Sequence, residues 1–118
     1  ILDCGIKAIQ EIEYAKSLGI DFIICAHHVP DDVMPPAVAI LNPKRPDDPF
    51  PFKHLCGCGV GFKFMQAFAK NNNIPFSRLI RFHDFFAVSI AADIVPVLDE
   101  NRILAFHGLK LLNTNPSI

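Results

Sequence analysis

Acidic and imidazole side chains occur at three places in an otherwise apolar sequence. Asp3 follows two apolar residues, His27 and His28 follow an apolar run, and Asp93 lies within another. Carboxylate and imidazole groups are suitable ligands for divalent metal ions, and apolar elements hold the backbone so that ligands at their ends converge. The pattern predicts a divalent-metal site, and metal-assisted hydrolysis is the chemistry that such a site supports.

Each of these residues also has an explanation that involves no metal. Asp3 could be the N-cap of a helix that begins near Ile6. A double histidine such as His27-His28 is, taken alone, more often an exposed pair in a loop. Asp93 lies between apolar neighbours and needs a partner to offset its desolvation, and either a metal ion or a nearby arginine meets that need.

Composition limits the fold and the partners. The 118 residues are 51% hydrophobic and 19% charged, which is enough apolar content for a single core and indicates one domain or part of one. The net charge of -1 exerts no general attraction on a polyanion, so contact with nucleic acid would need local basic groups or bound metal. Two of the four cysteines lie in apolar runs, where a thiol behaves as a small hydrophobic group, and a reducing cytoplasm is the expected location. No apolar run approaches the roughly 18 residues of a membrane span, so we expect no membrane association.

Apolar spacing predicts alternating helices and strands. We expect a helix over 6–18 that ends at Gly19, buried parallel strands over 20–25 and 37–41, an exposed loop over 44–51, and helices over 57–70, 85–92 and 101–113. The buried stripe of the last helix is expected to be Ile103, Leu104, Phe106, Leu109 and Leu112. The fold class is therefore α/β, a parallel sheet flanked by helices and followed by a helical segment. Ligands in such folds bind at the carboxyl ends of strands, where Asp3 and His27 lie.

Other motifs favour structural explanations. His54, Cys56 and Cys58 could suggest zinc, but no second Cys/His pair follows. The glycines of segment 57–61 follow a loop instead of a strand, so close packing of a helix is a better explanation than a dinucleotide site. Scattered basic residues could line a groove that binds a nucleic-acid strand, although a solvated charge on the surface is the expected role for each of them. They are Arg45, Lys53, Lys63, Arg78, Arg81 and Arg102. Phe50, Phe52 and Phe76 could stack on bases, but core packing is the expected role for most of them.

Several blocks follow one another along the sequence: Leu2-Asp3-Cys4-Gly5-Ile6, His27-His28-Val29-Pro30, segment 42–47, segment 51–63, segment 89–96 and Glu100-Asn101-Arg102-Ile103-Leu104. Together and in this order they resemble the RecJ family of single-stranded-DNA-specific exonucleases, within the DHH phosphoesterase superfamily. The resemblance covers essentially the whole chain. It implies a piece of a longer protein, with residues 1–118 forming a partial DHH catalytic domain that lacks the family's upstream Asp-rich block and downstream domains.

The resemblance also implies a role for each candidate site residue. Asp3 would bridge two divalent ions, Mn²⁺ or Mg²⁺, while His27 would bind one ion and Asp93 would be the last metal-binding aspartate. His28 would be the catalytic residue that contacts the scissile phosphate. The family's Asp-His-His station here has Ala26 in place of the aspartate, a departure behind the metal ligands that implies a weakened, inactive or altered parent.

The function implied for the full-length parent is 5′ to 3′ hydrolysis of single-stranded DNA with two metal ions, in DNA repair and recombination. Single-stranded DNA is the expected partner, together with a single-strand-binding protein or a helicase. We expect the fragment alone to be inactive. One alternative is a weakened or inactive DHH relative that acts as a DNA-binding or assembly scaffold. Another is a DHH phosphodiesterase acting on oligonucleotides or cyclic dinucleotides.

Overall fold

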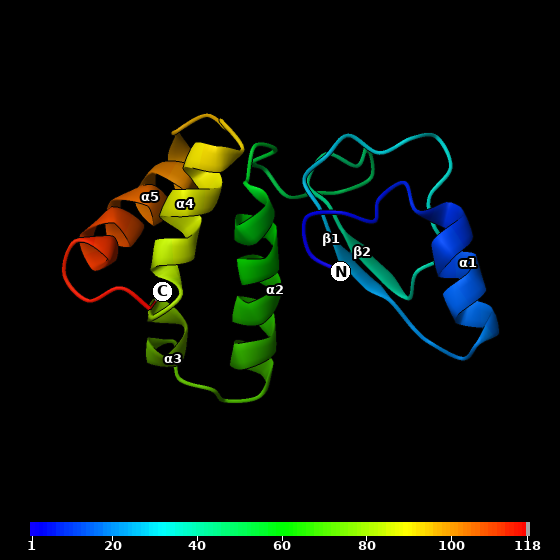
Figure 1. Ribbon diagram of the computed structural model, residues 1–118, viewed down its shortest axis with the longest axis horizontal. Coiled ribbons are helices and arrows are strands. Elements are labelled where there is room, and N and C mark those ends of the chain that lie inside the picture. Colours follow the sequence, from blue (N-terminus) through cyan, green and yellow to red (C-terminus); the bar gives the residue numbers. More distant parts are fainter. Residues whose placement is uncertain (118) are drawn as a thin grey trace.

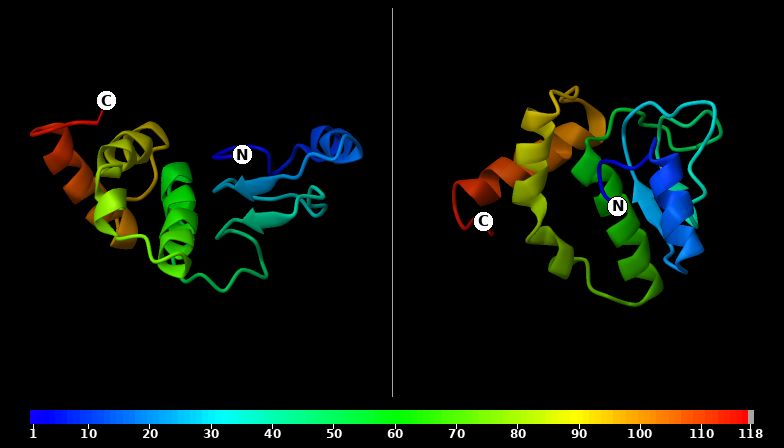
Figure 2. Two further views of the ribbon diagram at one scale, coloured as in Figure 1. Left: turned by 90° about the horizontal axis from the view of Figure 1, so that it is seen from below. Right: turned by 45° about the vertical axis from the view of Figure 1, so that its right-hand side comes forward.

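The computed structural model describes residues 1–117 and measures 46 × 30 × 26 Å. Its elements in chain order are α1 (Ile9–Ser17), β1 (Ile23–Cys25), β2 (Ala39–Leu41), α2 (Gly57–Asn71), α3 (Ser77–Ile80), α4 (His83–Ala92) and α5 (Asp99–Leu112). Figure 1 shows α2 between two halves, with the strands and α1 on one side and the remaining helices on the other. Both views in Figure 2 show the same arrangement. The predicted α/β class, with a parallel sheet followed by helices, is confirmed.

The sheet brings together chain segments that are far apart in the sequence. β1 pairs in parallel with β2, in the register Ile23 to Ala39 and Cys25 to Leu41. On the other edge of β1, Leu2 forms an isolated parallel bridge with Cys25, and the Asp3 amide donates to the Cys25 carbonyl at 2.7 Å. The strands are shorter than predicted, because regular pairing begins only at Ile23 and Ala39.

The helices agree with the predicted ones to within a few residues, with two differences. α3 was not predicted, because its four residues are too few to show a helical period. The N-cap alternative for Asp3 is wrong, since α1 begins at Ile9 with Ala8 at its N-cap. Asp3 thus lies well before the helix, where its side chain has no backbone amides of α1 to cap.

The predicted buried stripe of α5 is also wrong for most of its members. Leu104 is buried, but Ile103, Phe106 and Leu109 are 59%, 65% and 54% exposed. The buried face instead consists of Asn101, Leu104 and Gly108. Gly108 explains this choice, because a Cβ there would lie 2.3 Å from the His83 carbonyl oxygen of α4. α5 therefore packs against α4 at Gly108, where the absence of a side chain lets the two backbones approach closely.

Three groups of buried side chains form the core. One joins α2 to α4 and α5 around Phe62, Phe86 and Leu104. The second packs Ile12 of α1 against Ile24 and Ala26. The third joins the sheet to α2 through Cys25, Leu55 and Val60. The second and third clusters lie on opposite faces of β1. Within residues 1–117, no helix has the length and apolar character needed to cross a membrane.

Candidate metal centre

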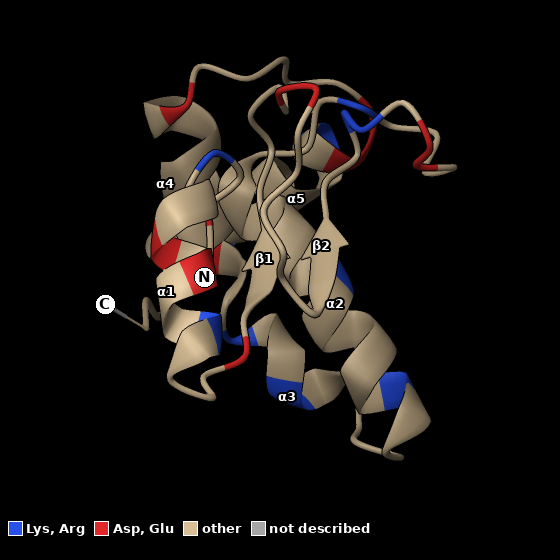
Figure 3. Cartoon of the chain, turned by 90° about the vertical axis from the view of Figure 1, so that its right-hand side faces the viewer, with Lys and Arg blue, Asp and Glu red and all other residues tan. Residues whose placement is uncertain are grey.

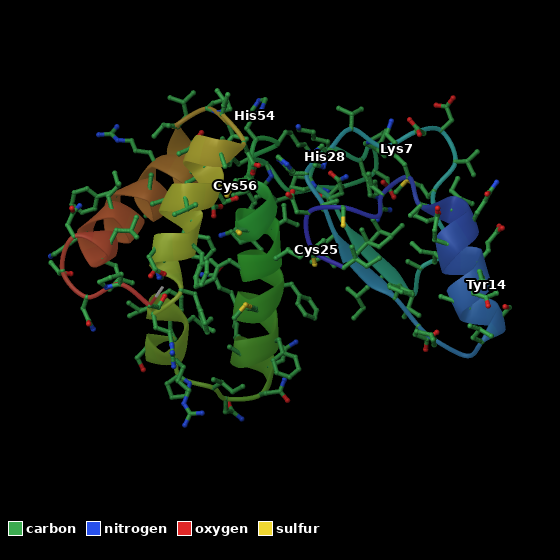
Figure 4. The ribbon with its side chains drawn as sticks, viewed as in Figure 1. Lys7, Tyr14, Cys25, His28, His54 and Cys56 are labelled. Atoms are coloured by element: carbon green, nitrogen blue, oxygen red, sulfur yellow. The ribbon has the colours of Figure 1, made fainter. Side chains whose placement is uncertain are left out.

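The predicted site residues lie at the carboxyl end of β1. His27 and His28 follow this strand directly, and Asp3 follows the bridge that Leu2 makes beside it. Figure 4 shows His28 at the upper end of β1, on the same side of the molecule as Cys56 at the start of α2. Parallel pairing places all these chain ends at one edge of the sheet, which is where α/β proteins bind ligands.

Three of the four predicted residues have possible ligand atoms within 4.8 Å of one another: Asp3, His27 and His28. Asp93 joins them from the C-terminal end of α4, with its Oδ2 at 3.8 Å from His27 Nε2. Asp3 Oδ1 lies 3.1 Å from the same nitrogen. The structure thus brings two carboxylates toward one imidazole nitrogen from segments about 90 residues apart in the sequence.

Asp3 and His27 are close without being hydrogen-bonded to each other. Within residues 1–117, the buried atoms Asp3 Oδ1 and His27 Nδ1 have no hydrogen-bond partner. The 3.1 Å contact is therefore one of proximity, because donor and acceptor are not aligned. Buried polar atoms are rarely left without a partner. The oxygen and nitrogen donors fit a divalent ion such as Mn²⁺, which would supply the missing partner of Asp3.

The start of α2 forms one wall of this centre. A Cβ on Gly57 would lie 2.1 Å from Asp3 Oδ1, so only glycine leaves room for that carboxylate. Asp3 also has a φ of +69°, which Asp tolerates better than most residues. Asp93 is held here too, because its Oδ2 accepts from the Gly57 amide at 3.3 Å and from Ser89 Oγ at 3.2 Å.

The His27 side chain is buried, and its environment favours the uncharged imidazole. Burial lowers the pKa of His27, and His28 and Lys44 act in the same direction, whereas Asp93 and Asp3 oppose the shift. The pKa therefore lies below the ordinary histidine value, which keeps the imidazole unprotonated near neutral pH. A neutral imidazole is the form that binds metal ions.

Asn42 supports the double histidine and was not identified from the sequence as a site residue. It lies just after β2 and is 1% exposed. Its Nδ2 donates to the His28 carbonyl at 2.8 Å, and its Oδ1 accepts from the Lys44 amide at 2.9 Å. The only sequence signal for it was an Asn-Pro pair at a strand end, which also marks an ordinary turn.

Ala26 lies between the end of β1 and His27. It is fully buried in the aliphatic cluster with Ile6, Ile12 and Ile24. A carboxylate at this position would face those side chains, and its desolvation would be costly.

The rival motifs have structural roles. Cys56 Sγ caps α2 by accepting from the Gly59 amide, and burial raises the pKa of this thiol. Gly61 packs closely on Leu2, consistent with the close helix packing predicted for the glycines of segment 57–61. Phe50 and Phe52 pack against the third core cluster, whereas Phe76 is 52% exposed.

Several of the basic residues are already paired within the chain. Arg45 pairs with Asp47, Lys63 pairs with Glu100, and Lys53 donates to the Asp48 carbonyl. Figure 3 shows acidic and basic segments interspersed in the loops above the two strands. This arrangement favours surface and structural roles for those three cations over a continuous basic groove.

A family model provides the classification. The model of the DHH family, N-terminal domain, matches residues 1–90, and the chain belongs to the DHH family. Among curated proteins it is similar to the single-stranded-DNA-specific exonuclease RecJ of Bacillus subtilis, with 42% identity over 111 residues. It is also 38% identical over 118 residues to the RecJ of Escherichia coli. The matches include 94% and 92% of this chain but 13% and 20% of those two relatives, so the predicted resemblance is confirmed for a part of their length.

Solved structures support the same grouping. A crystal structure of exonuclease RecJ bound to manganese has a TM-score of 0.78 and 29% identity, covering 92% of this chain and 27% of that one. RecJ from Thermus thermophilus in complex with Mn²⁺ has a TM-score of 0.81 and 28% identity, covering 98% of this chain and 17% of that one. Both neighbours bind manganese, which agrees with the predicted divalent-metal cofactor.

Proposed function

We propose that residues 1–118 form part of the catalytic domain of a metal-dependent phosphodiesterase related to RecJ. The observation that carries this proposal is the convergence of Asp3 and Asp93 on His27 Nε2 at the carboxyl end of β1. The orphaned Asp3 Oδ1 supports a cation as its missing partner. The chain spans only 13% to 20% of the two curated relatives named above, so the activity of a whole protein is part of the proposal.

Each side chain has a proposed role in this site. Asp3 would be the ligand shared by two divalent ions, His27 would bind one of them, and Asp93 would complete the ligands that this chain contributes. Two such ions would neutralise a phosphodiester and lower the pKa of water at the site. His28, which is exposed beside His27, contacts the scissile phosphate. Gly57 and Ser89 hold the Asp93 carboxylate by hydrogen bonds, so that it stays directed toward His27.

The proposed substrate is single-stranded DNA, cleaved in the 5′ to 3′ direction by the full-length parent. We place that parent in DNA repair and recombination in the cytoplasm, working beside a single-strand-binding protein or a helicase. The names of the curated relatives support the substrate class. Direction and partners follow from the resemblance alone.

An inactive scaffold is the second candidate, and Ala26 is the observation that favours it. The chain has an aliphatic environment at the position where the family has an acidic residue. A parent that binds DNA without cutting it would keep the fold and the apolar packing of Ala26. An enzyme acting on oligonucleotides or cyclic dinucleotides would share the metal centre and differ in the surrounding surface.

Manganese binding by the 118-residue chain tests the proposal directly. We expect weak but saturable Mn²⁺ binding, seen by electron paramagnetic resonance, that is lost in Asp3→Asn and retained in Asp21→Asn, which changes an exposed carboxylate before β1. We also expect no degradation of 5′-labelled single-stranded DNA, because at least one ion of a two-ion site would be short of protein ligands. Equal Mn²⁺ binding by Asp3→Asn would overturn the site assignment, and robust nuclease activity of the chain alone would overturn the view that its site is incomplete.

A further inference from the structure

Asn101 connects three segments through one buried side chain. It lies in the first turn of α5 and is fully buried. Its Nδ2 donates to the His54 carbonyl at 2.6 Å and to the Pro96 carbonyl at 3.0 Å, while its Oδ1 accepts from the Cys56 amide at 3.4 Å. These bonds use both protons of the amide and its oxygen, so the side chain is fixed in one orientation.

The segments held by Asn101 are the two that bring Asp93 into the candidate metal centre. Cys56 directly precedes Gly57, whose amide donates to Asp93 Oδ2. Pro96 lies three residues after Asp93 in the loop between α4 and α5. Asn101 therefore acts on both sides of the contact between Gly57 and Asp93, although its side chain touches neither of them in the bonds described.

The loop that follows Asp93 has an unfavourable backbone conformation. Ile94 has a φ of +51°, in the left-handed region that a β-branched residue rarely adopts. Its side chain is 88% exposed and offers little packing to hold it in place. Such a conformation persists when surrounding contacts impose it. The bond from Asn101 to the Pro96 carbonyl is such a contact, two residues after the strained one.

We propose that Asn101 is a positioning residue for the candidate metal centre, holding the loop after Asp93 and the segment before Gly57 at the separation that keeps Asp93 directed toward His27. The metal part of this inference rests on the proposed function. The positional part, that Asn101 maintains the contact between Gly57 and Asp93, stands on the hydrogen bonds alone. The neighbouring ion pair of Glu100 with Lys63 ties the same turn of α5 to α2.

Asn101→Ala in the 118-residue chain tests both parts, with Leu104→Ala as the matched control. Leu104 is buried on the same helix one turn later and packs in the core, so its truncation removes stability without removing a bond to either segment. Stability is measured for both variants by urea unfolding, and the comparison is made at temperatures where each is folded. Asn101→Ser, whose hydroxyl can still donate to one carbonyl, replaces Asn101→Ala if the latter does not fold.

Two readouts separate positioning from stability. The first is hydrogen exchange of the Gly57 amide relative to the Ile74 amide, which donates to the Ala69 carbonyl near the end of α2. The second is Mn²⁺ affinity by electron paramagnetic resonance. For Asn101→Ala we expect the Gly57 amide to exchange faster relative to Ile74, and Mn²⁺ to bind about 10-fold more weakly, the lower end of the span for groups behind metal ligands. We expect neither change in Leu104→Ala.

A second substitution tests the role of the strained loop. Ile94→Asn places a residue that tolerates positive φ at the strained position. Combined with Asn101→Ala, it should restore part of the Gly57 protection and of the Mn²⁺ affinity, while alone it should change them little. Additive effects of the two substitutions would contradict the proposed link between them.

The outcomes distinguish this inference from the proposed function. Equal changes in Asn101→Ala and Leu104→Ala would overturn the positioning role and leave the metal site standing. Absence of Mn²⁺ binding by the unsubstituted chain would overturn the proposed function and the metal part of the inference. The exchange of the Gly57 amide would still decide whether Asn101 positions Asp93.

Discussion

At the residue scale, the candidate centre depends on a close approach between a carboxylate and a helix start. Asp3 occupies the space that a side chain at position 57 would fill. The same glycine amide donates to Asp93, so one residue adjoins both carboxylates. The geometry predicts that position 57 controls metal affinity as well as stability.

Gly57→Ala is expected to displace the Asp3 side chain. The new Cβ would lie 2.1 Å from Asp3 Oδ1 and 2.9 Å from Asp3 Cβ, distances that force a shift. We expect Mn²⁺ affinity to fall at least about 10-fold and the free energy of unfolding to fall by about 1–3 kcal/mol. Gly19→Ala is the control, because it places alanine at a φ of +73° with no atom within 4 Å and should leave Mn²⁺ binding unchanged. Unaltered Mn²⁺ affinity in Gly57→Ala would argue against Asp3 as a ligand.

Ala26→Asp restores the aspartate of the family's Asp-His-His motif and tests whether its loss matters. In a chimera where this chain replaces the matching part of Bacillus subtilis RecJ, a carboxylate behind the ligands should tighten Mn²⁺ binding and speed cleavage within about 10–100-fold. The structure adds a cost, because Ala26 is buried among Ile6, Ile12 and Ile24, and unfolding should become easier. Cleavage of 5′-labelled single-stranded DNA is measured across a manganese titration with and without the substitution. Full activity without it would show that Ala26 is tolerated, and inactivity of both would favour the scaffold.

At the element scale, α5 illustrates how packing can override an apolar pattern. Its predicted stripe of large apolar residues is mostly exposed, and the helix contacts α4 through Gly108. Close backbone approach at Gly108 orients the helix, and that orientation directs Asn101 toward the loops before α2 and after α4. The way α5 packs on α4 thus influences the candidate centre, because it fixes the position of Asn101.

Gly108→Ala should weaken this docking. Its Cβ would meet the His83 carbonyl oxygen at 2.3 Å and Ala87 Cβ at 2.9 Å, and the backbone oxygen cannot move aside without shifting α4. We expect the free energy of unfolding to fall by about 1–3 kcal/mol, measured by urea denaturation. Leu109→Ala, at the exposed neighbouring position, should change it by no more than about 0.5 kcal/mol. Similar losses in the two variants would show that Gly108 is not a packing constraint.

The C-terminal tail makes stability depend on pH through Asp84. Burial alone would raise the pKa of this carboxyl, but hydrogen bonds from Ser117 and from the Phe85 amide outweigh it, so the pKa is lowered. A lowered folded-state pKa contributes stability that is complete above the unfolded value of about 3.9 and is lost as pH falls through the folded value. In urea unfolding, the stability difference between the unsubstituted chain and Asp84→Asn should therefore shrink below about pH 4. A difference that does not change with pH would contradict this assignment.

At the scale of the whole molecule, the two halves leave an apolar groove between them. The groove has a volume of about 610 Å³, and its walls come from the first two residues, β1, α2 and α4. Leu2, Phe64, Met65 and Phe85 line it, and each is at least 36% exposed. Exposed apolar surface of this kind promotes association.

We expect the 118-residue chain to associate as its concentration rises. Met65→Lys should reduce association by placing a charge in the groove, whereas Tyr14→Lys, on the exposed face of α1, should not. Size-exclusion chromatography with light scattering measures the mass of each variant. A monodisperse monomer with cooperative unfolding would contradict the expectation.

The sequence by itself determined the elements and the chemistry they could bring together. Helical spacing and short apolar runs are local signals, so α1, α2, α4 and both strands could be predicted with small errors at their ends. The types of Asp3, His27, His28 and Asp93 indicated a metal, because carboxylates and imidazoles near apolar segments suit divalent ions. The order of the blocks indicated the family. Their roles as ligands remain proposals.

Only the tertiary structure decided what supports those residues. Local patterns do not record the close approach of Gly57 to Asp3, since it joins segments 54 positions apart. Nor did the apolar stripe of α5 reveal that Asn101 and Gly108 face inward, because the docked helix is oriented by backbone contact. The buried hydrogen bonds of Asn42 and Asn101 depend on partners brought near by folding, and asparagine in a sequence marks a turn or a surface equally well. Long-range packing therefore determined the surroundings of the site.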